Sequence, residues 1–233
     1  MVLRWAERNG EIQQPVGWLE GIRLPRVTGG TKVIRTELLP EQVLAFVERM
    51  KEPYSTLVLL LAATGLRGEE AVGFKPADLD SNGILHIHRV YYHGQVEELE
   101  TERLLSLDLV LHAELIARLR FLGTGREWIF QSRAGNPLNL GNARSRYLQP
   151  TAAAIGVRIG GWHDFRHTLI RSLRRAGVNP VVISGIAGHS KVELAAEVYD
   201  KASAADMRQA LSVIGEQLLP QLLPGDSVQS VSC

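Results

Sequence analysis

The stretch YSTLVLLLAA over residues 54–63 is apolar around nearly its whole circumference and ends at Thr64-Gly65. A helix without a polar face has to be enclosed by other elements. It is too short to cross a bilayer, which takes about 20 apolar residues, and no other apolar run in the chain is longer. The N-terminus also lacks the apolar segment of a secretory signal. We therefore expect a central buried helix in a globular domain.

The elements expected around this helix are mainly α-helical, with one small antiparallel β-sheet. Asn82-Gly83 and His93-Gly94 are turn dipeptides beside the β-rich stretch ILHIHRVYY, so 83–109 is predicted to form a hairpin or meander. A helix is expected to open over 36–41, with Pro40 in its first turn. Further helices are expected at about 110–122, 139–155, 164–176, 180–187, 192–199 and 204–219.

Composition divides the chain into three parts. Residues 1–9 look like the end of a helix, and 10–35 carry glycine, proline and basic residues without helical periodicity. Such a short helix is unstable alone, so 1–35 is interpreted as the stub of an upstream domain followed by a linker. The main domain is expected over 36–203. An amphipathic helix and a disordered tail are expected over 204–233, the helix docking either on its own domain or on a neighbouring protomer.

Charge and cysteine content limit the classes of function only loosely. The net charge is +1, from 26 Lys+Arg and 25 Asp+Glu, so bulk charge does not indicate nucleic-acid binding. Only five of the cations are lysines, and arginine suits paired contacts with phosphate. The single cysteine, Cys233, excludes an intramolecular disulfide and fits a reducing cytoplasmic location.

The segment GGWHDFRHT over 160–168 gathers ionisable side chains at the expected start of a helix. His163 and Arg166 are three residues apart and can face one side of the first turn, where free N–H groups favour an anion. Alternatively, Asp164 caps the helix and the other groups are solvated. His163 and His167 also imitate the spacing of a zinc-binding H-E-x-x-H helix. Arg166 in the same turn repels a divalent cation, so we expect no metal.

Two further segments carry candidate groups. TGLRGEE places Arg67 directly after the buried helix, with Glu70 three residues later. GHS over 188–190 is followed by Tyr199. Taken singly, the first is better explained as an ordinary surface ion pair, and the tyrosine as a half-buried packing residue.

Together, TGLRxxE, HxxRHT, GHS and a following tyrosine resemble, in this order, the tyrosine recombinases of the phage integrase family, over residues 36–203. The resemblance implies the mostly α catalytic-domain fold of these DNA breaking-rejoining enzymes. It also implies that a phosphate-binding set and the nucleophile Tyr199 cut and rejoin DNA through a 3′-phosphotyrosyl intermediate. The phosphate-binding set is Arg67, His163, Arg166 and His189.

The resemblance further implies site-specific recombination or integration of double-stranded DNA, in the cytoplasm of a bacterium or from a phage, without cofactor, metal or membrane. Self-association on DNA as a tetramer is expected. Residues 1–35 would be the end of a core-binding domain and its linker. Arginines on the predicted helices are candidate contacts to the DNA backbone: Arg144, Arg146, Arg171, Arg174 and Arg175.

The sequence departs from the family at the β-hairpin. The family has a lysine there, commonly in a Lys-Thr pair, which protonates the leaving oxygen. The corresponding pair here is Glu100-Thr101, and no lysine occurs between 76 and 190. Arg103 is nearby, but a guanidinium is a poor proton donor near neutral pH. The sequence therefore leaves two alternatives: an active recombinase, or a truncated, catalytically impaired remnant that only binds DNA.

Overall fold

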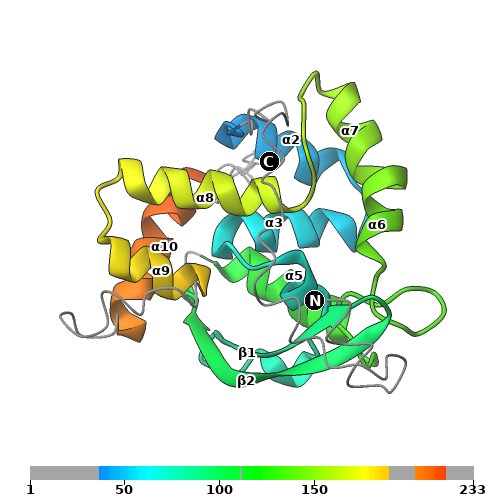
Figure 1. Cartoon of the computed structure of the whole chain (residues 1–233), viewed down its shortest axis with the longest axis horizontal. Helices are drawn as coiled ribbons and strands as arrows, with labels where there is room; N and C mark the ends of the chain where they lie inside the picture. The colour runs from blue at the N-terminus through cyan, green and yellow to red at the C-terminus, as the bar shows by residue number, and fades with distance from the viewer. Residues whose placement is uncertain (1–36, 111, 189–202, 219–233) are drawn as a thin grey trace, which may run out of the picture. The chain divides into compact units, whose positions relative to one another are not determined.

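The computed structural model describes residues 37–110, 112–188 and 203–218, which form a mainly helical domain with one small sheet (Figure 1). The fold class expected from the sequence is confirmed. The predicted stub and linker over 1–35 and the predicted helix over 192–199 lie outside the described residues. In chain order the elements are α2 (Pro40–Arg49), α3 (Tyr54–Thr64), α4 (Gly68–Val72), the 3₁₀ turn η2 (Pro76–Asp78), β1 (Ile84–Tyr92), β2 (Gln95–Ser106), α5 (Ala113–Gly123), α6 (Leu140–Ala143), the π-helical turn η3 (Arg144–Leu148), α7 (Gln149–Ala154), α8 (His163–Arg175), α9 (Pro180–Ala187) and α10 (Ala204–Leu218).

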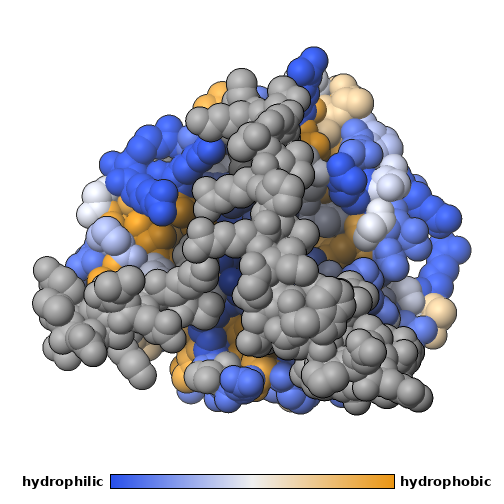
Figure 2. All heavy atoms as spheres, viewed as in Figure 1, coloured by the Kyte–Doolittle hydropathy of each residue, from blue (hydrophilic) through white to orange (hydrophobic). Residues whose placement is uncertain are grey.

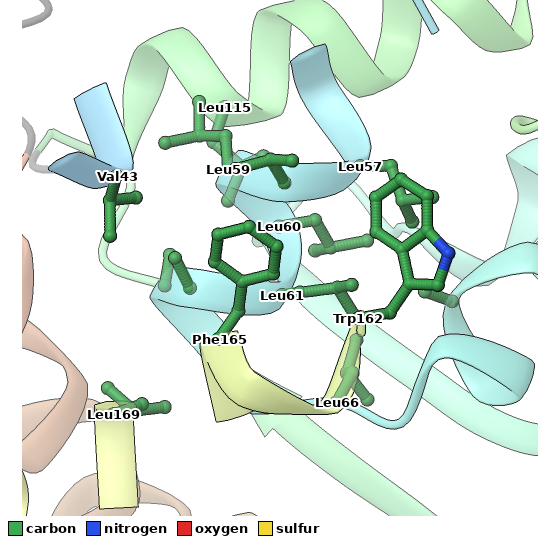
Figure 3. Close-up of a cluster of buried hydrophobic side chains, with 14 of the residues drawn as sticks. Val43, Leu57, Leu59, Leu60, Leu61, Leu66, Leu115, Trp162, Phe165 and Leu169 are labelled. Carbon is green, nitrogen blue, oxygen red and sulfur yellow. The ribbon is translucent and has the colours of Figure 1, made fainter. Parts of the chain in front are cut away.

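Helix α3 is the centre of the hydrophobic core, as its sequence predicts. Every residue from Ser55 to Thr64 is buried, and α2, α5, α8 and α10 pack against it. In Figure 3, Phe165 of α8 points at the leucines of α3, and Leu115 of α5 lies beside them. The Phe165 ring also meets Phe46 of α2 edge to face, with 5.4 Å between the ring centroids.

The polar groups of α3 are satisfied inside this core. Ser55 Oγ donates to Val47 O at 2.6 Å, and Thr64 Oγ1 donates to Leu60 O at 2.6 Å. Because a buried hydroxyl without a partner is costly, these bonds allow the helix to be enclosed on all sides.

The sheet is a two-stranded antiparallel hairpin of β1 and β2, closed by the predicted turn at His93-Gly94. At the base of the hairpin the strands pair regularly from Ile84↔Ser106 to Ile87↔Arg103. At its outer end they pair from Arg89↔Glu98 to Tyr92↔Gln95. Between these regions one residue of β1, His88, lies opposite residues 99–102 of β2. This irregularity divides the hairpin into a base that packs on the core and an outer end that is largely exposed.

One predicted helix differs in detail from expectation, and for another the structure decides between two alternatives. The segment 139–155 is helical, but η3 interrupts it with a π turn between α6 and α7. Helix α10 packs on its own domain, against β2, α8 and α9, with Ala210 and Leu211 buried.

No helix in the described part of the chain has the length and apolar content needed to span a bilayer. The described surface in Figure 2 is mainly hydrophilic on both flanks of the view, with apolar patches between.

His112 gives the fold a predicted dependence on pH. The side chain is fully buried at the start of α5, and burial lowers its pKa, although Asp108 acts in the opposite direction. The folded state therefore keeps His112 neutral, while the unfolded chain gains a proton near pH 6.5. The contribution of His112 to the free energy of unfolding is fully present above about pH 6.5. It falls as the pH drops below this value, by at most about 1.4 kcal/mol per pH unit.

Urea unfolding between pH 5 and pH 7.5 measures this effect. We expect His112→Asn to flatten the acid side of the stability profile. His93→Asn, at an exposed histidine, is the matched control and should leave the profile unchanged. Parallel profiles for the wild type and His112→Asn would contradict the assignment.

Candidate active site

Arg67 is positioned by the end of the buried helix. Gly65 takes the left-handed conformation, with φ 67°, and its N–H donates to Leu61 O at 2.9 Å. A side chain at Gly65 would meet Leu169 of α8, because a Cβ there would lie 2.8 Å from Leu169 Cδ2. The chain therefore turns tightly against α8. Arg67 lies two residues later, at the N-cap of α4, so its backbone position is set by the packing of this turn.

Arg166 is almost completely buried, with 1% of the residue exposed. Its Nη1 donates to Gly65 O at 2.6 Å, and its Nη2 donates to Ala187 O. Burial, together with the neighbouring charges of Arg67 and Arg103, lowers the pKa of Arg166 to about 10, although Glu70 acts in the opposite direction. The guanidinium therefore remains charged at neutral pH. The structure brings Arg67 and Arg166 into one cluster.

His163 lies on the first turn of α8 but is oriented differently from Arg166. The residue is exposed, and its ring meets the ring of His167 edge to face at 4.8 Å between centroids. Asp164 is buried, and its Oδ2 accepts from Gly160 N at 2.6 Å. Asp164 thus fixes the glycine turn before α8, which is a structural role. The described residues contain no group of three His, Cys, Asp or Glu side chains arranged to hold a metal ion.

Glu70 is the only carboxylate that an ion pair joins to these arginines in the described part of the chain. It is 3% exposed, and its Oε1 accepts from Arg67 Nη1 at 2.9 Å. Its Oε2 accepts from Arg67 N and from Arg103 Nη2, both at 2.8 Å. Burial raises the pKa of Glu70, but Arg103 and Arg67 outweigh burial and lower it overall. Three guanidiniums around one carboxylate leave a net positive site that favours an anion.

The arginines also hold the C-terminal end of α9. Ile186 O accepts from Arg103 Nη1, Ala187 O from Arg166 Nη2, and Gly188 O from Arg67 Nη2 at 3.1 Å. These are three consecutive carbonyls at a helix end, where backbone oxygens lack helical partners and carry partial negative charge. Each arginine of the cluster therefore binds one of them. We define Arg67, Arg103, Arg166 and Glu70, with the end of α9, as the arginine cluster.

Sequence reasoning missed Arg103 as a member of this cluster. The sequence did carry a signal. Arg103 and Leu105 are two residues apart in β2 and therefore lie on the same face of the strand, and Leu105 is buried. Ile87, its partner on β1, is also buried. An arginine in an inward position on a strand needs a buried acceptor, which Glu70 provides.

The other predicted residues have different settings. His189 and Tyr199 lie outside the described residues. Glu100 is exposed on β2, within the irregular part of the hairpin. Arg144 is half-buried against Gly161, just before α8, and its Nε is buried without a hydrogen-bond partner among the described residues. The remaining predicted DNA contacts are all exposed: Arg146, Arg171, Arg174 and Arg175. Of these, Arg175 forms an ion pair with Glu37.

Gly188 gives a direct test of the packing in this cluster. Gly188 and Gly177 are both left-handed, with φ 58° and 75°. A Cβ at Gly188 would lie 2.8 Å from Arg103 Nε and 3.1 Å from Arg103 Cζ, whereas at Gly177 nothing lies within 4 Å. We expect Gly177→Ala to cost about 1 kcal/mol of unfolding free energy for the backbone alone. Gly188→Ala should cost about 1–3 kcal/mol more, because Arg103 must shift. Urea unfolding measures both, and equal losses would refute the close packing.

Comparison with known proteins bears on the family and the fold of the chain. The phage integrase family matches residues 36–205. An integrase of Streptomyces ambofaciens is 32% identical over an alignment of 87 residues that covers 34% of this chain and 22% of that protein. The matched segment thus spans about a fifth of that relative.

Solved structures share the fold. The Tn1549 transposon integrase, in complex with transposon right end DNA, superposes with a TM-score of 0.62 at 20% identity, covering 83% of this chain and 70% of that one. The integrase of mycobacterium phage Brujita gives 0.54 at 17% identity, covering 93% and 68%. The XerH site-specific recombinase bound to difH substrate gives 0.52 at 19% identity, covering 68% and 48%. Since the family match extends over well more than half of the sequence and the fold agrees, the chain belongs to the phage integrase family of tyrosine recombinases.

Proposed function

We propose that this chain is the catalytic part of a site-specific recombinase that cuts and rejoins double-stranded DNA through a 3′-phosphotyrosyl intermediate. The observation that carries the proposal is the meeting of Arg67 and Arg166, which are distant in sequence, in one net positive cluster. In this proposal the catalytic domain spans 36–203 and follows a core-binding domain and linker that end in 1–35.

The chemistry needs guanidiniums that are fixed but retain free donors. A guanidinium has five N–H donors. Arg67 uses one terminal nitrogen on Glu70 and the other on Gly188 O, and its side chain is 39% exposed. Donors remain for the non-bridging oxygens of a phosphate, and these bonds strengthen as negative charge develops in the transition state. A fixed donor of this kind is worth about 10²–10³ in rate.

Tyr199 is the proposed nucleophile. Its oxygen bonds to phosphorus and loses its proton, while the bond to the 5′ oxygen of the next nucleotide breaks and that oxygen gains a proton. His163 is the proposed general acid/base, and its exposed position at the start of α8 leaves it accessible to substrate. His189 is proposed as a hydrogen-bond donor to the phosphate. Because the phosphotyrosyl bond conserves the energy of the broken bond, neither ATP nor metal is needed.

Double-stranded DNA is the proposed partner. Two structural relatives, the Tn1549 integrase and XerH, were solved with DNA. The exposed arginines of α8 and η3, together with Arg144, are proposed to contact the DNA backbone. Such contacts position the protein without reading sequence. Self-association on the DNA as a tetramer belongs to the same proposal.

Glu100 favours a second candidate, a remnant that binds DNA without cutting it. A carboxylate at the position proposed for the lysine removes a general acid, which typically costs about 10²–10⁴ in rate. Arg103 does not replace the lysine in this arrangement, because both of its terminal nitrogens donate to Ile186 O and Glu70.

A nicked suicide DNA substrate separates the two candidates. The substrate is drawn from pooled DNA flanking the gene, and the readout is a protein–DNA adduct that survives denaturation. We expect the native chain to form the adduct and Tyr199→Phe to form none, since phenylalanine has no nucleophile. Glu100→Lys should form it at least 10-fold faster, because it restores a general acid.

An adduct from Glu100→Lys but not from the native chain would identify an impaired recombinase with an intact pocket. If neither forms an adduct while a gel shift shows that DNA is bound, the remnant is the correct assignment.

A further inference from the structure

Arg103 joins the hairpin to the arginine cluster, and nothing in the reaction proposed above uses it. We propose that Arg103 is a positioning residue: it holds Glu70 and the end of α9 so that Arg67 keeps donors for a phosphate and keeps its place beside Arg166. The inference rests on the proposed function for its meaning in catalysis, but its physical content, the binding of phosphate, is testable without DNA.

The contacts of Arg103 tie it to the protein on three sides. Its side chain is 15% exposed, its Nη2 donates to Glu70 Oε2 at 2.8 Å, and its Nη1 donates to Ile186 O. Its guanidinium packs so closely on Gly188 that a Cβ there would lie 2.8 Å from Nε. A group tied in this way is suited to holding its neighbours rather than to reaching for a leaving oxygen.

The contact with Glu70 determines what Arg67 can do. Glu70 is buried, so both of its oxygens need partners. Oε2 accepts from Arg67 N and from Arg103 Nη2, and the charge of Arg103 on this oxygen leaves Arg67 to use one terminal nitrogen on Oε1 and the other on Gly188 O. Without Arg103 the buried carboxylate would attract Arg67 into a paired contact, which guanidiniums readily form with carboxylates. Arg67 would then lose donors that a phosphate requires.

The contact with Ile186 O acts on the other side of the cluster. Arg166 and Arg67 bind the next two carbonyls, those of Ala187 and Gly188. The separation of the two guanidiniums therefore depends on where the end of α9 lies. Removing Arg103 frees one of the three attachments of that end, and a misplacement of about 1 Å between groups that bind one phosphate costs on the order of 10²-fold in rate.

The hairpin provides a matched control. Arg89 on β1 is also a nearly buried arginine, with 13% of its side chain exposed, and it pairs with a buried carboxylate, Asp78. Among the described residues, no hydrogen bond or ion pair joins Arg89 to the arginine cluster. Both Arg103→Leu and Arg89→Leu remove a buried ion pair, but only Arg103→Leu removes the one with Glu70. A difference between the two variants therefore reports the specific effect of the Arg103–Glu70 contact. Arg103→Lys keeps the charge, but its single ammonium group replaces a fork that reaches both Glu70 and Ile186 O.

The first measurement is the affinity for inorganic phosphate, by titration calorimetry at constant ionic strength. We expect Arg103→Leu and Arg103→Lys to weaken phosphate binding at least 10-fold and Arg89→Leu to change it less than 2-fold. If Arg103→Leu does not fold, Arg103→Lys carries the comparison. Binding by either folded Arg103 variant at the strength of Arg89→Leu would overturn the proposal, as would a wild type that binds no phosphate.

The second measurement uses the suicide DNA and separates positioning from general structural damage. At saturating DNA, the rate of adduct formation should fall about 10–100-fold in Arg103→Leu, while the DNA dissociation constant changes less than 2-fold, because DNA affinity is spread over many phosphate contacts. An equal fall in affinity and rate would overturn the positioning role. If the phosphate result holds but the wild type forms no adduct, the recombinase assignment fails while the role of Arg103 in holding the phosphate site stands.

Discussion

The buried carboxylate of Glu70 allows three guanidinium groups to lie together, two of them, Arg103 and Arg166, largely closed to water. Like charges repel strongly where the surroundings are less polar than water. Glu70 offsets this repulsion by accepting from Arg67 and Arg103 and by lying close enough to Arg166 to affect its pKa. Burial alone would raise the pKa of Glu70, but the charges of Arg103 and Arg67 lower it overall, so the carboxylate and these arginines stabilise one another in their charged forms.

The hydrophobic core supplies the rigidity that this balance of charges needs. Helix α3 is enclosed on all sides and ends at Gly65, whose carbonyl accepts from Arg166 and whose turn leads to Arg67. Trp162 and Phe165, on either side of His163, lie in the hydrophobic cluster with the leucines of α3 (Figure 3). The first turn of α8 is thus anchored by apolar side chains, and its polar ones are placed as a consequence.

The sequence predicted the parts of this structure that depend on local pattern. An apolar segment ending in glycine predicted α3, and two turn dipeptides predicted the hairpin. Ordered motifs predicted that Arg67 and Arg166 belong to one site. The helical spacing of His163 and Arg166 did not predict that one is exposed and the other buried, because Gly65 and Ala187, which hold Arg166, come from other elements. Arg103 was missed for the same reason, since its partners Glu70 and Ile186 are far away in sequence.

The irregular pairing in the hairpin has a consequence for how this part of the chain can change in evolution. Register in a regular ladder is transmitted along both strands, so a residue gained or lost at the turn would move every side chain below it to the opposite face. Here the mismatch around His88 interrupts the ladder between the turn and Arg103. The outer end can lengthen, shorten or exchange its acidic residues while the base keeps Arg103 on Glu70. Natural variation in hairpin length can therefore adapt the outer end to different partners without altering the charge balance beneath it.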